Sequence, residues 1–208
     1  MRIGVVRAIY RYPVKSLRGE SLERCDVLER GLAGDRTAAL IGGDGNWSAG
    51  KPYRGKEDNR LHVIASADEA LALDPGLELA YDDEGEFFDA APVSLLLDRW
   101  LDDLCEHLGY RAEFQRFRPN FFVEAAAGVS IDEAALVGHE LQLGDVTLRV
   151  REPIERCAVP SYDLTTGESD PRVLRFLVQQ RANEMGVYCD VLRAGTVRTG
   201  DSLELIEC

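Results

Sequence analysis

Short apolar stretches separated by glycine turns run through most of this chain, and they restrict its fold more than any other feature. Residues 3–10 have the pattern of a strand, and residues 141–150 contain two more strands around the turn Gly144-Asp145. Further strands are expected at residues 22–28, 37–41, 61–64, 77–81, 112–117, 121–124, 187–192 and 203–206. Many short strands joined by such turns are typical of a β-barrel core.

Helical spacing occurs in only a few places. In residues 93–108 the apolar side chains recur at intervals of three and four, and Gly109 follows as a helix end. A second helix is expected to begin at Asp170-Pro171, because this pair suits the first positions of a helix. Residues 66–73 are ambiguous. The predicted fold class is therefore mainly β with a few helices (α+β), built on a β-barrel.

The composition excludes several classes of protein. The net charge of −13 gives no sign of the basic surface that nucleic-acid binding requires, and no apolar run approaches the roughly 20 residues of a membrane span. The five cysteines form no Cys-x-x-Cys pair and the N-terminus resembles a strand rather than an export signal, so we expect reduced thiols in the cytoplasm. The three histidines lack the spacing of zinc ligands.

Cys157 stands out by its surroundings. An apolar strand pattern precedes it, Arg156 is its neighbour, and a turn-rich segment follows at residues 163–167. A ligand can reach a thiol at such a strand end, and the guanidinium favours the thiolate. Thiolate is a soft ligand that suits a heavy transition metal. The alternative, a small buried hydrophobic residue, is the commoner state of an isolated cysteine.

Three further polar clusters stand at expected strand ends or turns: Lys15 with Ser16, Asp35 with Arg36, and Arg118 with Asn120. The Lys15 turn can act as a phosphate cradle with free backbone amides, or it is a solvated turn. Arg36 belongs either to a binding site or to a surface ion pair. Pro119 stiffens the third cluster. Together with Cys157, these residues suit an anionic, phosphorylated cofactor and a soft metal.

The ordered set of motifs resembles the MOSC family, named for the C-terminal domain of molybdenum cofactor sulfurase. The resemblance runs from about Ile9 to Leu205 and is nearest to bacterial stand-alone MOSC proteins and the mitochondrial amidoxime-reducing component. Its motifs are Tyr12-Pro-Val-Lys-Ser-Leu-Arg-Gly19, Gly34-Asp-Arg36, Phe117-Arg-Pro-Asn120, Arg156-Cys157, Asp163-Leu-Thr-Thr-Gly-Glu168 and Gly195-Thr-Val-Arg-Thr-Gly-Asp201.

The resemblance implies a molybdenum cofactor, with Cys157 as the metal ligand and catalytic residue. The residues that it assigns to the pterin and its phosphate are Lys15, Ser16, Arg36, Lys51, Arg118, Asn120 and Arg156. It implies a β-rich N-terminal domain at residues 1–85 and a MOSC β-barrel at residues 86–208. The stretch Ser48-Ala-Gly-Lys51 departs from the family pattern, so Lys51 is expected to take the basic role there.

For activity, the resemblance implies reduction of small N-hydroxylated compounds with electrons from a separate flavoprotein, iron–sulfur or haem carrier. The chain has no Gly-x-Gly-x-x-Gly motif for a nicotinamide cofactor of its own. At the level of the whole family, pyridoxal phosphate binding is implied as well. Two alternatives stay open: a sulfur carrier that holds a persulfide on Cys157, and a cofactor-binding protein without turnover.

Overall fold

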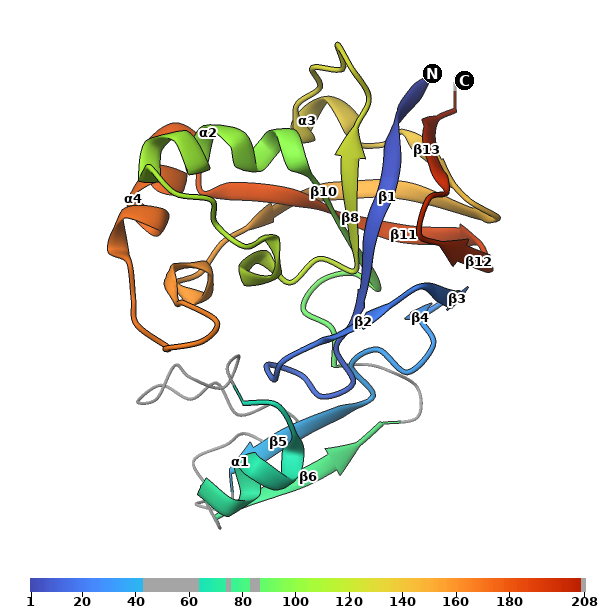
Figure 1. Ribbon diagram of the computed structural model, residues 1–208. Coiled ribbons are helices and arrows are strands. Elements are labelled where there is room, and N and C mark those ends of the chain that lie inside the picture. Colours follow the sequence, from blue (N-terminus) through green and yellow to red (C-terminus); the bar gives the residue numbers. More distant parts are fainter. Residues whose placement is uncertain (43–63, 74–75, 83–86, 207–208) are drawn as a thin grey trace.

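The computed structural model describes residues 1–42, 64–73, 76–82 and 87–206, and within them seven strands close into a barrel (Figure 1). These strands are β1 (Arg2–Arg11), β7 (Val93–Leu97), β8 (Phe121–Ala125), β9 (Glu140–Leu143), β10 (Val146–Glu155), β11 (Glu184–Arg193) and β13 (Ser202–Leu205). Their order is β13-β9-β10-β11-β7-β8-β1, and pairing of β1 with β13 closes the ring. The predicted fold class is confirmed.

β7 corrects one prediction. Residues 93–108 were expected to be helical throughout, but Val93–Leu97 is a strand and only Asp98–Leu108 forms the helix α2. All five residues of β7 are buried, since it lies between β11 and β8 in the sheet. A continuous apolar run does not distinguish a fully buried strand from a buried helix, because neither face is polar.

A second correction concerns residues 112–117, which were expected to be a strand. They contain the 3₁₀ turn η2 (Phe114–Phe117) instead. The Phe114 ring stacks on Phe122 with the ring centroids 4.1 Å apart, and Phe117 is fully buried. Two aromatic residues three positions apart can anchor one face of a 3₁₀ turn. The turn ends at Arg118, whose φ of 52° is left-handed.

The connection from β10 to β11 carries the cysteine motif. It contains the short turn η3 (Val159–Ser161) and the helix α4 (Pro171–Gln180). The predicted start of α4 is confirmed: Pro171 occupies the first turn, and the Asp170 carboxylate accepts a hydrogen bond of 3.0 Å from the Arg172 amide. Cys157 lies two residues beyond the last residue of β10.

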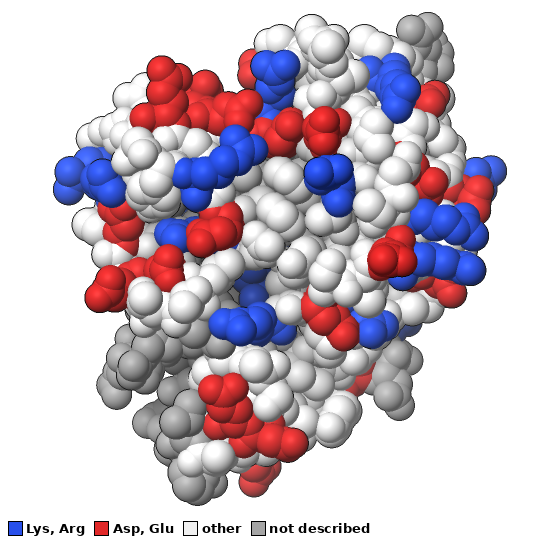
Figure 2. Space-filling view, in the orientation of Figure 1, with Lys and Arg blue, Asp and Glu red and all other residues white. Residues whose placement is uncertain are grey.

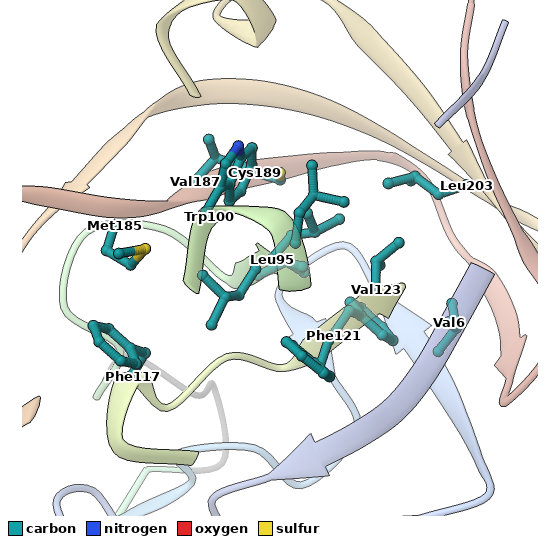
Figure 3. Packing of buried hydrophobic residues seen from close by; sticks show 14 of the residues in the cluster. Val6, Leu95, Trp100, Phe117, Phe121, Val123, Met185, Val187, Cys189 and Leu203 are labelled. Carbon is teal, nitrogen blue, oxygen red and sulfur yellow. The ribbon is translucent and has the colours of Figure 1, made fainter. Parts of the chain in front are cut away.

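The main core fills the barrel and extends under α2, whose buried residues include Trp100 and Leu104. Figure 3 shows Leu95, Phe121 and Val187, from three different strands, among the side chains of this core. The predicted end of α2 is confirmed, because Gly109 follows it with a left-handed φ of 76°. The packed core therefore holds the ends of the barrel strands in fixed positions.

Smaller elements complete the fold. The remaining strands are β2 (Glu20–Leu22), β3 (Arg24–Leu28), β4 (Gly31–Leu32), β5 (Ala38–Gly42), β6 (Leu77–Tyr81) and β12 (Gly195–Arg198), and the remaining helices are α1 (Ala67–Leu73) and α3 (Glu133–Leu136). The β5–β6 pair and α1 lie together at one end of the molecule (Figure 1) and share a second small core that contains Leu17 and Leu40. The ambiguous residues 66–73 are thus largely helical.

β1 comes from the N-terminal stretch but pairs with β8 and β13 of the barrel. The boundary between residues 85 and 86 stays a prediction. Residues 61–63 of one expected strand lie outside the described residues. No helix in the described part of the chain is long and apolar enough to span a membrane.

Candidate functional site

A buried tyrosine at the end of β1 organises a cluster of basic side chains. The Tyr12 hydroxyl donates to the carbonyl oxygen of Pro119 at 3.2 Å. The guanidinium carbon of Arg118 lies 4.2 Å from the centre of the Tyr12 ring, and that of Arg36 lies 5.1 Å from it. Both distances are within the range of cation–π attraction. One aromatic ring therefore holds two guanidinium groups from distant parts of the sequence.

Backbone pairing brings the Lys15 turn beside Arg36. The Arg36 amide donates to the Tyr12 carbonyl and the Lys15 amide donates to the Ala38 carbonyl, each at 2.8 Å. The Lys15 amide is therefore not free to bind a ligand, unlike the backbone amides of the phosphate cradle considered above. Ser16 is half-buried. Ser16 and Arg36 both have positive φ values, 70° and 51°, which side-chain-bearing residues rarely adopt.

Two aspartates offset part of the positive charge. Asp35 accepts a hydrogen bond of 2.6 Å from the Tyr12 amide and forms an ion pair with Arg36. Both partners are less than a tenth exposed, so this is not the surface ion pair considered above. Lys15 Nζ lies 2.7 Å from Asp89 Oδ1. Partial burial acts to raise the pKa of Asp89, but Lys15, Arg36 and Arg118 together outweigh this effect and lower it.

Arg118 has one hydrogen-bond donor left over. Its Nη1 donates to the Leu17 carbonyl at 2.6 Å, whereas Nη2 is shielded from solvent and has no partner in the described residues. Burial lowers the pKa of Arg118, and the like charge of Arg36 lowers it further. A buried donor without a partner is costly. An anionic oxygen would satisfy it, so the residues present fit a phosphorylated ligand.

Asn120 is a structural residue in this arrangement. Its Oδ1 accepts from the amide and the hydroxyl of Ser94 at 3.0 and 2.9 Å, and its Nδ2 donates to the Tyr10 carbonyl at 3.3 Å. The side chain is fully buried. These bonds tie β1 and β7 to the segment that carries Arg118, so Asn120 positions this segment.

Arg156 has a similar structural position. Its Nη1 donates to the Phe117 carbonyl at 3.0 Å, and its Nε donates to the Met185 carbonyl at 2.7 Å. Burial lowers its pKa to about 10. Gly186 makes room for the guanidinium, because a Cβ there would lie 3.1 Å from Arg156 Nη2 and 2.9 Å from the Leu95 carbonyl oxygen. Arg156 thus fastens the end of β10 to β11 and η2.

Cys157 is the exposed cysteine among the four that the structure describes; Cys208 lies outside them. Burial raises the pKa of Cys25 to about 12 and also raises that of Cys189, which keeps both thiols protonated. The interpretation of Cys157 as a small buried hydrophobic residue is therefore wrong. The described residues contain no group of three or more His, Cys, Asp or Glu side chains that could hold a metal.

The loop after Cys157 is firmly held. Asp163 Oδ1 accepts from the amides of Thr165 and Thr166 at 2.8 Å, and Oδ2 pairs with the buried Arg116 at 2.9 Å. The amide bonds are the main reason that the pKa of Asp163 is lowered. This arrangement confirms the predicted turn-rich segment.

Arg156 connects Cys157 with the basic cluster, because it precedes Cys157 in the chain and its Nη1 donates to the carbonyl oxygen of Phe117, the residue before Arg118. Tyr188 lies on β11, the strand that also holds Met185 against Arg156. Burial is the main reason that the pKa of Tyr188 is raised. Sequence reasoning did not select Tyr188 or Asp89, since neither stands in a motif. It quoted Tyr12 within the first motif but gave the residue no role.

A hollow of about 300 Å³ opens beside Tyr12 and Arg118, with other walls from Arg18, Gln115 and Thr165. Figure 2 shows basic atoms recessed below the surface near the middle of this face. The structure thus brings Lys15, Arg36 and Arg118 together, and Arg156 links the Cys157 loop to the segment that carries Arg118. Lys51 lies outside the described residues.

Two family models match the chain. The model of the MOSC domain matches residues 82–204, and that of the MOSC N-terminal beta barrel domain matches residues 3–81. The mitochondrial amidoxime-reducing component 1 of Mus musculus is 28% identical over 137 residues, which cover 60% of this chain and 39% of that protein. The chain therefore spans well under half the length of this curated relative.

Solved structures show the same fold. The YuaD protein from Bacillus subtilis superposes with a TM-score of 0.61 at 16% identity, over 97% of this chain and 94% of that one. YiiM from Escherichia coli superposes with a TM-score of 0.50 at 14% identity, over 100% of this chain and 71% of that one. At such identities the similarity concerns the fold alone.

Proposed function

Because the chain belongs to the MOSC family, we propose that it binds the molybdenum cofactor and reduces N-hydroxylated compounds. The observation that carries the proposal is the placement of an exposed thiol, Cys157, beside Arg156, which bonds to the segment of a buried basic cluster whose Arg118 has a donor without a partner in the described residues. A soft ligand and a phosphate site are the two things that such a cofactor requires of its protein.

In this proposal each residue has a defined task. Lys15, Arg36 and Arg118 hold the phosphate, with Ser16 as an added hydroxyl donor and Lys51 as a further base. Asn120 and Arg156 keep the cluster and the cysteine loop in place. Cys157 supplies sulfur to the metal, and the bound cofactor supplies the two-electron chemistry. Reducing N–OH to N–H consumes two electrons and two protons and releases water.

The decisive measurement is the molybdenum and pterin content of protein made in a host that synthesises the cofactor. We expect wild type to carry both. Cys157→Ser should remain folded, since the change is small, but should lose molybdenum. Cys105→Ser is the matched control, because Cys105 is half-buried on α2. Full molybdenum occupancy in Cys157→Ser would rule out Cys157 as the ligand.

The source of electrons is tested separately. A reduced viologen should support turnover of a hydroxylamine-type substrate, whereas NADH added to the purified protein should not. Robust NADH-dependent turnover without a partner would contradict the proposal that a separate carrier delivers the electrons.

A sulfur-carrier role is a second candidate, and the exposure of the Cys157 thiol favours it. In that case mass spectrometry of protein incubated with a persulfide donor, which transfers its outer sulfur atom and leaves as a thiol, would find one extra sulfur atom on Cys157. Tightly bound pterin after purification would argue against this role. Bound cofactor without turnover of any N-hydroxylated compound would leave the third alternative, a cofactor-binding protein.

A further inference from the structure

Asp89 forms an ion pair with Lys15 in which the two partners differ in burial. The nitrogen and oxygen atoms are 2.7 Å apart, the Lys15 side chain is 12% exposed, and the Asp89 side chain is 57% exposed. Asp89 stands outside every helix and strand. The carboxylate can therefore move into solvent, whereas the ammonium group stays enclosed.

Asp35 differs from Asp89 in this respect. It is buried, it accepts a hydrogen bond from the Tyr12 amide, and it pairs with Arg36. Moving Asp35 would disrupt the turn that shapes the cluster, whereas the contact seen for Asp89 within the described residues is its ion pair with Lys15. Of the two carboxylates, Asp89 is the one that a ligand can displace.

The net charge of the basic cluster also favours displacement of Asp89. Lys15, Arg36 and Arg118 bring three positive charges, and Asp35 and Asp89 bring two negative charges, so the cluster carries one net positive charge. Without Asp89 it would carry two. A phosphate monoester has a charge of about −1.5 to −2 at neutral pH. The charge of the cluster therefore balances that of the phosphate most closely when Asp89 has moved away.

Arg118 supplies an independent reason for a displacement. Its Nη2 has no hydrogen-bond partner in the described residues and is closed to solvent, so an anion can reach it only after a neighbouring group moves. The carboxylate of Asp89 lies close enough to Arg36 and Arg118 to act on the pKa of each. Departure of Asp89 would remove a competing negative charge from both.

We propose that Asp89 is a displaceable counter-ion that neutralises Lys15 until a dianionic phosphate takes its place. Because a monoanion gains too little from Lys15 to displace the carboxylate, Asp89 makes the site selective for dianions. This inference rests on the proposed function, in which the phosphate belongs to the cofactor.

The test uses protein made without the cofactor, with inorganic phosphate as the dianion and nitrate as a monoanion, at pH 8 and low ionic strength. Asp89→Asn should bind phosphate about tenfold more tightly than wild type, since a unit charge a few ångströms away acts strongly near a protein surface. Nitrate should compete with phosphate in Asp89→Asn but not in wild type. Lys15→Met should lose most of the phosphate affinity.

The matched control is Asp26→Asn, which changes the net charge equally at an exposed pair with Arg24. It should leave phosphate affinity within about twofold of wild type, because exposed charges are screened. Carbon-13 NMR of the Asp89 carboxylate, assigned by its absence in Asp89→Asn, reports displacement directly. The signal should shift when phosphate is added to wild type.

The outcomes separate the two proposals. Equal phosphate affinity in wild type and Asp89→Asn, or an Asp89 signal that phosphate does not shift, overturns the exchange and leaves the cofactor proposal standing. If no variant binds millimolar phosphate, the basic cluster is not an anion site, and the proposed function loses its phosphate pocket as well.

Discussion

Two groups of buried arginine in this protein differ in how well their charges are matched. Arg181 Nη2 lies 2.5 and 2.7 Å from the two carboxylate oxygens of Glu133, and Glu133 also accepts from the Gly186 amide. In the cluster around Tyr12, positive charges outnumber negative ones, and Arg118 Nη2 has no hydrogen-bond partner in the described part of the chain. Burial of a charge is therefore common to both groups, and the unmatched charge with its unpaired donor is what distinguishes the proposed site.

The largest expected effect is on the matched pair. Glu133→Gln should lower the free energy of unfolding by about 3–5 kcal/mol, because the largely buried Arg181 then has as its partner the exposed Asp103, at the longer distance of 3.9 Å. Urea unfolding followed by circular dichroism measures this. Phosphate affinity should not change. A loss below about 1 kcal/mol would show that the pair is structurally dispensable and would remove the contrast between the two groups.

The unmatched cluster should respond in the opposite way. Arg118→Met should weaken phosphate binding more than tenfold, as loss of a buried charged partner does. Its free energy of unfolding without ligand should change by less than about 1 kcal/mol, because losing the Leu17 hydrogen bond is offset by removing an unmatched buried charge. Arg118→Lys should recover only part of the affinity, since ammonium lacks the planar fork. If Arg118→Met binds phosphate as tightly as wild type, Arg118 has only a structural role.

The buried thiol of Cys189 shows how burial shifts a pKa where no opposite charge lies nearby. Burial raises the pKa of Cys189, and the adjacent Asp190 adds to the effect. In the unfolded chain this thiol ionises near pH 8.5, whereas in the folded protein it stays protonated. The stability that the buried Cys189 thiol contributes is therefore fully present below pH 8.5 and is lost as the pH rises above it. Stability should fall by at most about 1.4 kcal/mol per pH unit from this group.

Urea titrations between pH 8 and 9.5 measure the slope, below the range in which tyrosines ionise. Cys189→Val should reduce the slope because valine does not titrate, and the slope that remains is expected from Cys25, whose pKa burial also raises. The same slope in wild type and Cys189→Val would mean that the folded thiol ionises as readily as the unfolded one.

The smallest effect is expected where an arginine pair is exposed. Arg149 and Glu140 lie 2.6 Å apart, with side chains 51% and 33% exposed. Arg149→Met should change the free energy of unfolding by less than about 1 kcal/mol, because solvent and salt screen such pairs. A loss comparable to that of Glu133→Gln would show that burial is not what separates the groups.

Much of the fold could be predicted from local patterns. The strand pattern of β10, the glycine end of α2 and the Asp-Pro start of α4 are local signals, and the structure confirms them. β7 was misassigned because burial on both faces removes the period that separates strand from helix. The turn η2 was missed because its stability comes from stacking on Phe122, a tertiary contact.

The candidate site was predictable where a motif marks it. Lys15, Arg36 and Arg118 come together as the resemblance implied, although their roles stay a prediction. Arg156 and Asn120 stand in motifs as well, but sequence could not reveal that their hydrogen bonds are used within the fold. Asp89 and Tyr188 gave no signal, because each matters only through neighbours far away in sequence.

The position of β1 links assembly of the barrel to assembly of the site. Its first residues pair with β13, and the Met1 amine reaches the Leu205 carbonyl across 204 positions of sequence. Contacts between such distant segments form slowly, since the closure of a long loop precedes them. Until they form, β8 and β13 present unpaired edges, and Tyr12 lacks the strand that positions it. A nascent chain should thus assemble the basic cluster around Tyr12 only at the end of folding, so that the proposed anion site would form after the barrel that encloses it.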